Sequence, residues 1–348
     1  MKTHLTALAT LMCMVAGCRE EPVAASYENL GNGAGSARAA PIRAAAQKIF
    51  DLTAARQWQD VYLDMSPEVR GDLSASQFIA QSEMMAERLG SLEDLGILEI
   101  HVAEFSPLPE GSPPGAMTGV HGTSNVLPDP IVLTTPVPGH VAIVLARATS
   151  SKARQCGWLT VVLQKQEEKW WFVASHMTPC EVQGHDGPWF LHRATQYESQ
   201  GQRRNAFLYR GLGARLLLPG PFIRVPSASK QLEEFRSDGA PPNMPLTGVR
   251  PSEEWQMADG TTLVVDHIDS SSGARLLSLE VRYKSQQSDA ESREARAERE
   301  KLFRYICERF PEYEEAFDGV NVTSVTSLGQ AFCDYFPFST GGTGTSPN

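Results

Sequence analysis

Apolar residues recur at helical spacing over the first part of the chain. Pro41 opens a segment in which one helical face carries Ile42, Ala45, Ala46, Ile49 and Phe50. In a second segment, Trp58, Val61, Tyr62 and Met65 stand at i, i+3, i+4 and i+7, and Ser66-Pro67 follows as a stop signal. A third segment begins at Ser74 and ends at Gly90. The pattern therefore predicts three helices.

After Gly96 the hydrophobic period changes to the alternation and short apolar runs that are typical of strands. Strands are expected at 97–105, 131–133 and 141–146, with a Pro- and Gly-rich loop over 106–130. A long hairpin closes this part, with strands at 157–165 and 170–176 and a turn at 166–169. Helices followed by strands indicate an α+β domain.

This order of elements resembles the NTF2-like (cystatin-like, SnoaL-like) cone. The resemblance is carried by AAAQKIFDLTAARQWQDVYLDMSPEVR at 44–70, SASQF at 74–78 and LTVVLQKQEEKWWFV at 159–173. It implies a domain over 41–180 with three helices and a curved antiparallel sheet. In that family the sheet leaves a conical pocket that holds a ligand, an active site or only core side chains.

The second half predicts a smaller α+β domain over 189–338, joined by a linker at 181–188. A helical hairpin is expected at 189–218, a short helix at 229–236 and a β-meander at 254–283. A charged helix at 289–309 and strands at 320–327 and 332–338 complete it, and 339–348 reads as a disordered tail. The stretch 184–222 resembles uncharacterised bacterial envelope proteins, a likeness that implies no activity.

The N-terminus indicates where the protein resides. Leu5 to Ala16 is apolar but too short to span a bilayer, and it leads into Val15-Ala16-Gly17-Cys18. This resembles the lipobox of bacterial lipoproteins, which implies removal of residues 1–17 and lipidation of Cys18; the alternative is an ordinary secretory signal. Arg19 replaces the aspartate of lipoproteins kept at the inner membrane, which favours the outer membrane. Residues 18–40 read as a flexible tether.

Charge limits the possible partners. The chain has 31 Lys and Arg against 41 Asp and Glu, a formal charge of −10. An acidic protein lacks the basic surface that nucleic acid requires, and it has no electrostatic attraction to anionic lipid. The expected membrane contact is therefore the lipid on Cys18, and no nucleic-acid partner is expected.

Four cysteines remain after the signal peptide and the lipidated residue: Cys156, Cys180, Cys307 and Cys333. An even number in an oxidising compartment favours disulfides, and four cysteines allow three pairings. Cys156 and Cys180 flank the closing hairpin, and Cys307 and Cys333 lie on a helix and the strand after it, so these local pairs are expected. The alternative, a redox thiol pair, lacks the usual C-x-x-C spacing.

Other familiar chemistries find little support. His176, Cys180 and His185 are close in sequence, but zinc needs a fourth ligand and usually shorter paired spacings. The glycines of GNGAGS at 32–37 follow no strand and precede no Lys-Ser pair, and there is no G-x-S-x-G motif. No metal and no cofactor are expected.

Any catalytic site in the cone would draw on a few polar residues. The weak candidates are Tyr62, Asp64, His101, His140 and His176. Each alone is more typical of a surface or core position. We therefore expect a non-catalytic binding or scaffold protein whose partner is an envelope protein or small ligand. The alternative is a hydrolase- or isomerase-type enzyme that uses the cone as its active site.

Overall fold

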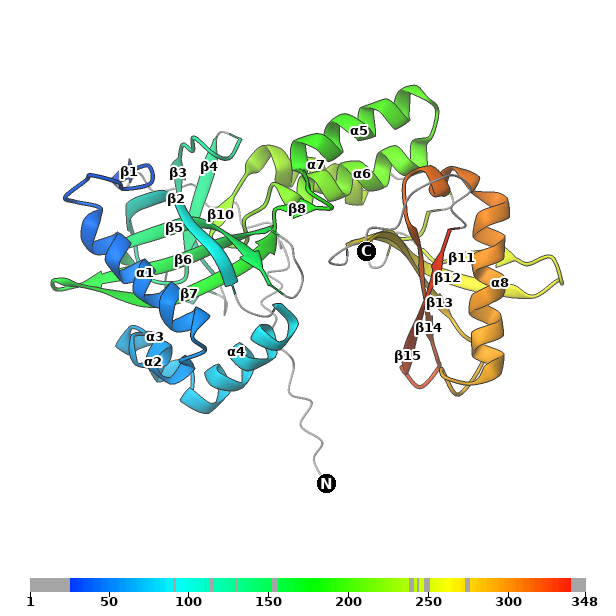
Figure 1. Cartoon of the computed structure of the whole chain (residues 1–348), viewed down its shortest axis with the longest axis horizontal. Coiled ribbons are helices and arrows are strands. Elements are labelled where there is room, and N and C mark those ends of the chain that lie inside the picture. The colour runs from blue at the N-terminus through cyan, green and yellow to red at the C-terminus, as the bar shows by residue number, and fades with distance from the viewer. Residues whose placement is uncertain are drawn as a thin grey trace.

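The computed structural model describes residues 26–89, 92–109, 111–112, 116–128, 130–151, 156–237, 241–242, 244–246, 251–272 and 276–338. The expected signal peptide at 1–17, Cys18 and the expected disordered tail at 339–348 lie outside these ranges. The described chain is a mixed α+β protein, as expected, with one sheet near each end and helices α5 to α7 between them (Figure 1). Among the described residues, none of the helices has the length and apolar character needed to cross a membrane.

The first large sheet is antiparallel throughout. Its order is β1 (Tyr27–Asn29), β2 (Leu92–Phe105), β5 (Gly139–Ser150), β6 (Cys156–Gln166) and β7 (Lys169–Pro179). The β6–β7 hairpin confirms the expected closing pair. Strand β1 corrects the expected tether, because residues 27–29 pair with 101–103 instead of forming a flexible segment.

Helices α1 (Ala40–Ala54), α2 (Trp58–Leu63), α3 (Pro67–Asp72) and α4 (Ala75–Leu89) pack on one face of this sheet. Helix α1 buries Ile42, Ala46, Ile49 and Phe50, as its spacing predicts. Helix α3 was not expected. Ser66-Pro67 is a start signal as well as a stop: the Ser66 hydroxyl accepts the Val69 N–H, and proline occupies the first turn.

A small sheet covers the opposite face, in the order β10 (Ile223–Arg224), β4 (Ile131–Thr135), β3 (Thr118–Gly122). Strand β3 falls in the expected 106–130 loop. Its sequence, TGVHG, has one buried apolar residue, Val120, between glycines, so no strand pattern is visible. Both faces of the large sheet are therefore covered.

The predicted helical hairpin is confirmed as α5 (Gly187–Ser199) and α6 (Arg203–Leu216), followed by α7 (Pro226–Ser237). The expected linker is itself ordered as a two-stranded hairpin, β8 (Glu181–Val182) and β9 (His185–Asp186). Asp186 then caps α5, since its carboxylate accepts the Trp189 N–H at 3.0 Å. Local polar contacts thus fix the entry to the hairpin.

The second large sheet has the order β11 (Glu253–Gln256), β12 (Thr262–Ser272), β13 (Leu277–Lys284), β14 (Gly319–Val325), β15 (Ala331–Pro337). The predicted meander forms β11 to β13. Strands β13 and β14 run parallel because helix α8 (Arg293–Arg309) and the short 3-10 helix η1 (Pro311–Glu315) carry the chain between them.

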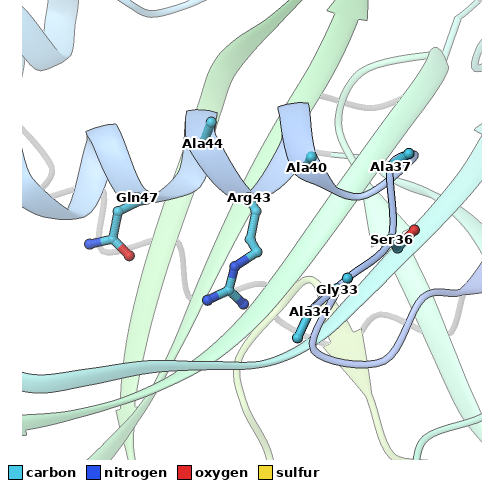
Figure 2. A pocket seen from close by; sticks show the side chains of 9 residues that line it. Gly33, Ala34, Ser36, Ala37, Ala40, Arg43, Ala44 and Gln47 are labelled. Atoms are coloured by element: carbon cyan, nitrogen blue, oxygen red, sulfur yellow. The ribbon is translucent and has the colours of Figure 1, made fainter.

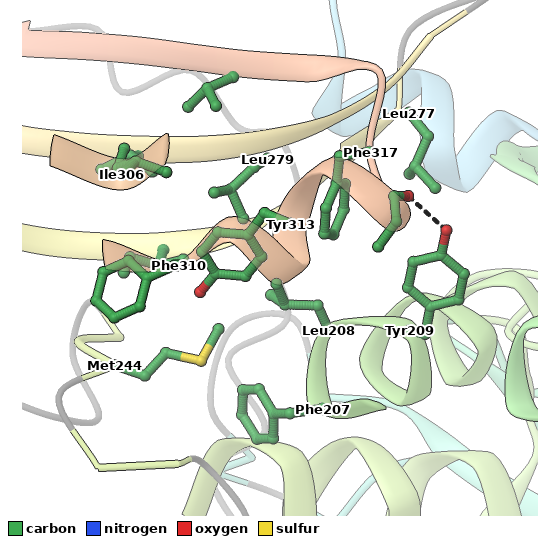
Figure 3. Packing of buried hydrophobic residues seen from close by; sticks show 14 of the residues in the cluster. Phe207, Leu208, Tyr209, Met244, Leu277, Leu279, Ile306, Phe310, Tyr313 and Phe317 are labelled. Atoms are coloured by element: carbon green, nitrogen blue, oxygen red, sulfur yellow. Dashed lines mark hydrogen bonds between the residues drawn. The ribbon is translucent and has the colours of Figure 1, made fainter. Parts of the chain in front are cut away.

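Helix α6 and η1 share the core of this second unit (Figure 3). Leu208 and Tyr209 of α6 face Tyr313 and Phe317, and the Tyr209 hydroxyl donates to the Ala316 carbonyl at 2.5 Å. The helical hairpin is therefore built into the packing of the C-terminal sheet.

Candidate functional site

The residues proposed for a catalytic cone have separate roles. The Tyr62 hydroxyl donates to the Leu73 carbonyl at 2.9 Å, which ties α2 to the end of α3. Asp64 accepts from two lysines, Lys48 at 2.6 Å and Lys169 at 3.2 Å. These contacts hold the helices to one another and to strand β7. Tyr62 and Asp64 therefore have structural roles.

His140 and His176 lie in different surroundings. His140 Nδ1 is 2.7 Å from a Glu104 carboxylate oxygen on the neighbouring strand β2, in a partly exposed polar contact. His176 on β7 packs against Gly220, and burial lowers the pKa of its imidazole. A Cβ added at Gly220 would be 2.3 Å from His176 Cδ2, so this contact requires glycine.

The space between the helices and the sheet is filled by apolar side chains. Phe50 and Val61 from the helices and Leu163 and Phe172 from the sheet are all buried in one cluster. The side of the sheet where a cone-type active site would open is therefore occupied by core.

His101, the remaining candidate, lies on the other face in a buried polar network. Glu99 and His101 on β2 are 1% and 0% exposed, with Glu99 Oε2 at 3.4 Å from His101 Nε2. Tyr27 Oη is 3.2 Å from His101 Nδ1, and the Ser124 hydroxyl and Asn125 N–H donate to the Glu99 carboxylate.

Glu99 stays ionised in this network. Burial opposes its charge, but the adjacent His101 ring and hydrogen bonds from Ser124, Asn125 and Asn29 outweigh that effect and lower its pKa to about 2. Sequence reasoning missed Glu99. The available signal was its place two residues before His101 on a strand, which puts both side chains on one face.

The four described cysteines are free thiols. Cys156 and Cys180 lie side by side, with their sulfurs 3.0 Å apart, so the expected bridge between them remains a prediction. The expected Cys307–Cys333 pair is corrected. Phe336 stacks on Phe303 and Asp334 pairs with Arg299, so these two residues of β15 face α8, which carries Cys307. Cys333 directly precedes Asp334 on the strand and therefore points to the opposite face, away from α8.

A shallow hollow of about 590 Å³ lies beside the start of α1 (Figure 2). Small residues line it, together with Gln47 and Arg43. The Arg43 guanidinium donates a hydrogen bond to the Asn32 carbonyl at 2.7 Å. The hollow thus offers a ligand little beyond small side chains. Elsewhere in the described ranges, no three His, Cys, Asp or Glu side chains gather in a metal-ligand set.

A second hollow, of about 320 Å³, is more distinctive in chemistry. Its lining comes from α5, α6 and η1 and consists of Trp189, His192, Arg193, Gln196, Tyr197, Tyr209 and Glu315. Trp189, His192, Arg193 and Gln196 share one face of α5, because they stand three, four and seven residues apart. We call this hollow the α5 groove.

Contacts among the lining residues preorganise the α5 groove. Trp189 is 38% exposed and stacks on His185, with ring centroids 3.7 Å apart. The Arg193 guanidinium lies 4.6 Å over the Tyr197 ring and donates to Gln196 Oε1 at 2.8 Å. The Tyr197 hydroxyl donates to the Glu315 carbonyl at 3.0 Å, which joins α5 to η1.

Comparison of the chain with known protein families, with curated proteins and with solved structures gives no match. The function must therefore be argued from the site. The α5 groove joins an exposed tryptophan, a guanidinium and an amide on α5 to the glutamate Glu315 on η1. That set of groups is suited to binding.

Proposed function

We propose that the chain is a membrane-anchored envelope lipoprotein that acts as a non-catalytic binding or scaffold protein. In this account residues 1–17 are removed, Cys18 carries the lipid and the outer membrane is the favoured location. The observation that carries the binding role is the α5 groove, in which the exposed Trp189 lies beside Arg193 and Glu315.

The favoured ligand is a segment of another envelope protein. A hollow of about 320 Å³ is at the small end of the range for small-molecule sites, and it has room for one or two side chains. Trp, Tyr and Arg are the residue types that contribute most to protein–protein binding energy. Arg193 and Glu315 add one charge of each sign, which favours a polar segment.

We also propose that residues 41–180 are an NTF2-like domain whose cone is closed by its own core. The order of helices before strands and the helices on one sheet face support this kinship. The enzyme alternative would need an accessible acid and base. The acid and base that lie closest to this requirement, Glu99 and His101, are almost completely buried.

Site-specific crosslinking in intact cells tests the binding role. A photo-crosslinking residue at His192, which lines the groove, should yield one discrete crosslinked product. The matched control is Thr195, which is exposed on α5 but outside the groove. The product should disappear with Trp189→Ala. A product that forms equally from both positions, or that survives Trp189→Ala, would refute the groove as the binding site.

A further inference from the structure

Cys156 and Cys180 stand directly opposite each other at the open end of the β6–β7 hairpin. The register pairs Gly157 with Pro179, and the next pair outward is Cys156 with Cys180, whose N–H donates to the Cys156 carbonyl at 3.0 Å. Such opposed residues have Cα atoms about 5.5 Å apart, within the range that a disulfide spans. The backbone therefore accommodates both the dithiol and the bridged form.

A cation and a carboxylate complete the cluster. Arg147, on the neighbouring strand β5, places its Nε 2.6 Å from the Cys156 sulfur, and its terminal nitrogen binds the Glu181 carboxylate. Arg147 thus places a positive charge beside the Cys156 sulfur, and the thiolate is the reactive form of a cysteine. Cys156 is partly exposed, whereas Cys180 is buried. A reagent therefore reaches Cys156 first.

We propose that Cys156 and Cys180 form a reversible thiol–disulfide exchange site, in which Cys156 is the attacking thiolate and Cys180 the resolving thiol. The substrate class is a disulfide, either of a small molecule or of an envelope protein. The Cys180 sulfur lies 3.0 Å from the Cys156 sulfur, close enough to attack a mixed disulfide formed on Cys156. This site is independent of the α5 groove.

The two thiols have different roles in the reaction. The Cys156 thiolate attacks one sulfur of the substrate disulfide, which forms a mixed disulfide and releases one substrate thiolate. That thiolate takes the Cys180 proton, and the Cys180 sulfur then attacks Cys156, breaks the mixed disulfide and releases the second substrate thiolate, which takes a proton from water. The substrate disulfide gains two electrons and two protons, and the protein dithiol becomes a disulfide.

The buried thiol is suited to the second step. Burial raises the pKa of Cys180 to about 12, with the hydrogen bond to Cys156 adding to the effect. Cys180 is therefore protonated until the leaving thiolate is generated beside it. This differs from a purely structural bridge, for which neither an adjacent guanidinium nor unequal exposure of the two sulfurs is needed.

The test uses the full mature chain with Cys307→Ser and Cys333→Ser, reduced and mixed with an aromatic disulfide reagent near pH 7. We expect about two reagent thiols released per chain and a product two hydrogens lighter, with the bridge between Cys156 and Cys180. In Cys180→Ser the mixed disulfide should remain trapped on Cys156. In Cys156→Ser, Cys180 should react at least about tenfold more slowly.

Arg147 provides the discriminating control. Arg147→Met should slow the attack by about tenfold near pH 7, and Arg147→Lys, which keeps the positive charge beside the sulfur, should retain most of the rate. A melting curve of each variant separates this effect from misfolding. The proposal is overturned if folded Arg147→Met reacts like the parent, or if Cys156 reacts no faster than the exposed Cys333 does in a Cys156→Ser, Cys180→Ser chain.

Discussion

Arg299 on α8 and Asp334 on β15 form an ion pair whose nitrogen, Nε, lies 2.6 Å from Oδ2 of the carboxylate. The Arg299 side chain is 1% exposed. Its guanidinium also donates to the Ala290 carbonyl and the Ser324 hydroxyl, each at 2.8 Å. One buried cation thus joins the charged helix to two strands of the C-terminal sheet.

Replacing Arg299 by Met should cost about 3–5 kcal/mol of unfolding free energy, because the Asp334 carboxylate loses its buried partner. Urea denaturation of the two chains measures the difference. Lys230→Ala serves as control, since the Lys230–Glu234 pair is exposed and should contribute less than about 1 kcal/mol. A loss below about 1 kcal/mol for Arg299→Met would show that the pair is not structural.

Glu99 should make stability depend on pH. Its folded pKa is about 2 against an ordinary value of 4.5, so its stabilising effect is present above about pH 4.5 and is lost as pH falls towards 2. Glu99→Gln should therefore cost on the order of 3 kcal/mol near neutrality. Urea midpoints across this pH window should show the two chains converging at low pH. A constant difference between them would contradict the lowered pKa.

Gly220→Ala should be strongly destabilising, by more than about 2 kcal/mol. The backbone φ is +119° and the added methyl would meet the His176 ring. Gly260→Ala, at φ +85° with open space around the Cβ, isolates the backbone cost, which should be about 1 kcal/mol. Combining Gly220→Ala with His176→Ala should restore the stability that Gly220→Ala loses beyond this backbone cost, because the steric clash with the ring is removed. Thermal melting measures the difference. No recovery would place the cost entirely in the backbone.

Cys18→Ser should abolish lipid attachment. The wild-type chain should incorporate a radiolabelled fatty acid and sediment with outer-membrane fractions, whereas the variant should do neither. A Cys13→Ser chain is the matched control, since Cys13 lies within the expected signal peptide. Equal labelling of wild type and Cys18→Ser would rule out the lipobox interpretation.

Strongly periodic segments were predictable from sequence alone. The Ile42 to Phe50 face gave α1, and the run from Leu159 to Val173 gave the β6–β7 hairpin, because each has its own unbroken hydrophobic pattern. Strands β1 and β3 were missed. Tyr27–Asn29 and Thr118–Gly122 are short and polar or Gly-rich, and they become strands only by pairing with the more apolar strands β2 and β4.

The candidate site was less accessible to sequence reasoning. The α5 groove combines residues of α5 with Glu315, which is more than a hundred positions further along the chain, and only folding brings them together. Likewise, the pairing of Cys156 with Cys180 followed from hairpin symmetry, whereas Arg147 beside Cys156 depends on the register of β5 against β6. The local hydrophobic pattern predicts individual helices and strands, whereas the tertiary fold and the register between strands determine which side chains meet in a site.

The most direct test of the binding role is quantitative purification of the full chain from the membranes of the cells that produce it. Wild type and Thr195→Ala should each recover one partner protein at close to equal stoichiometry, while Trp189→Ala should recover at least about tenfold less, because an exposed aromatic anchor is lost. Recovery of the same partner in the same amount with a folded Trp189→Ala chain, or of no stoichiometric partner with wild type, would contradict the account.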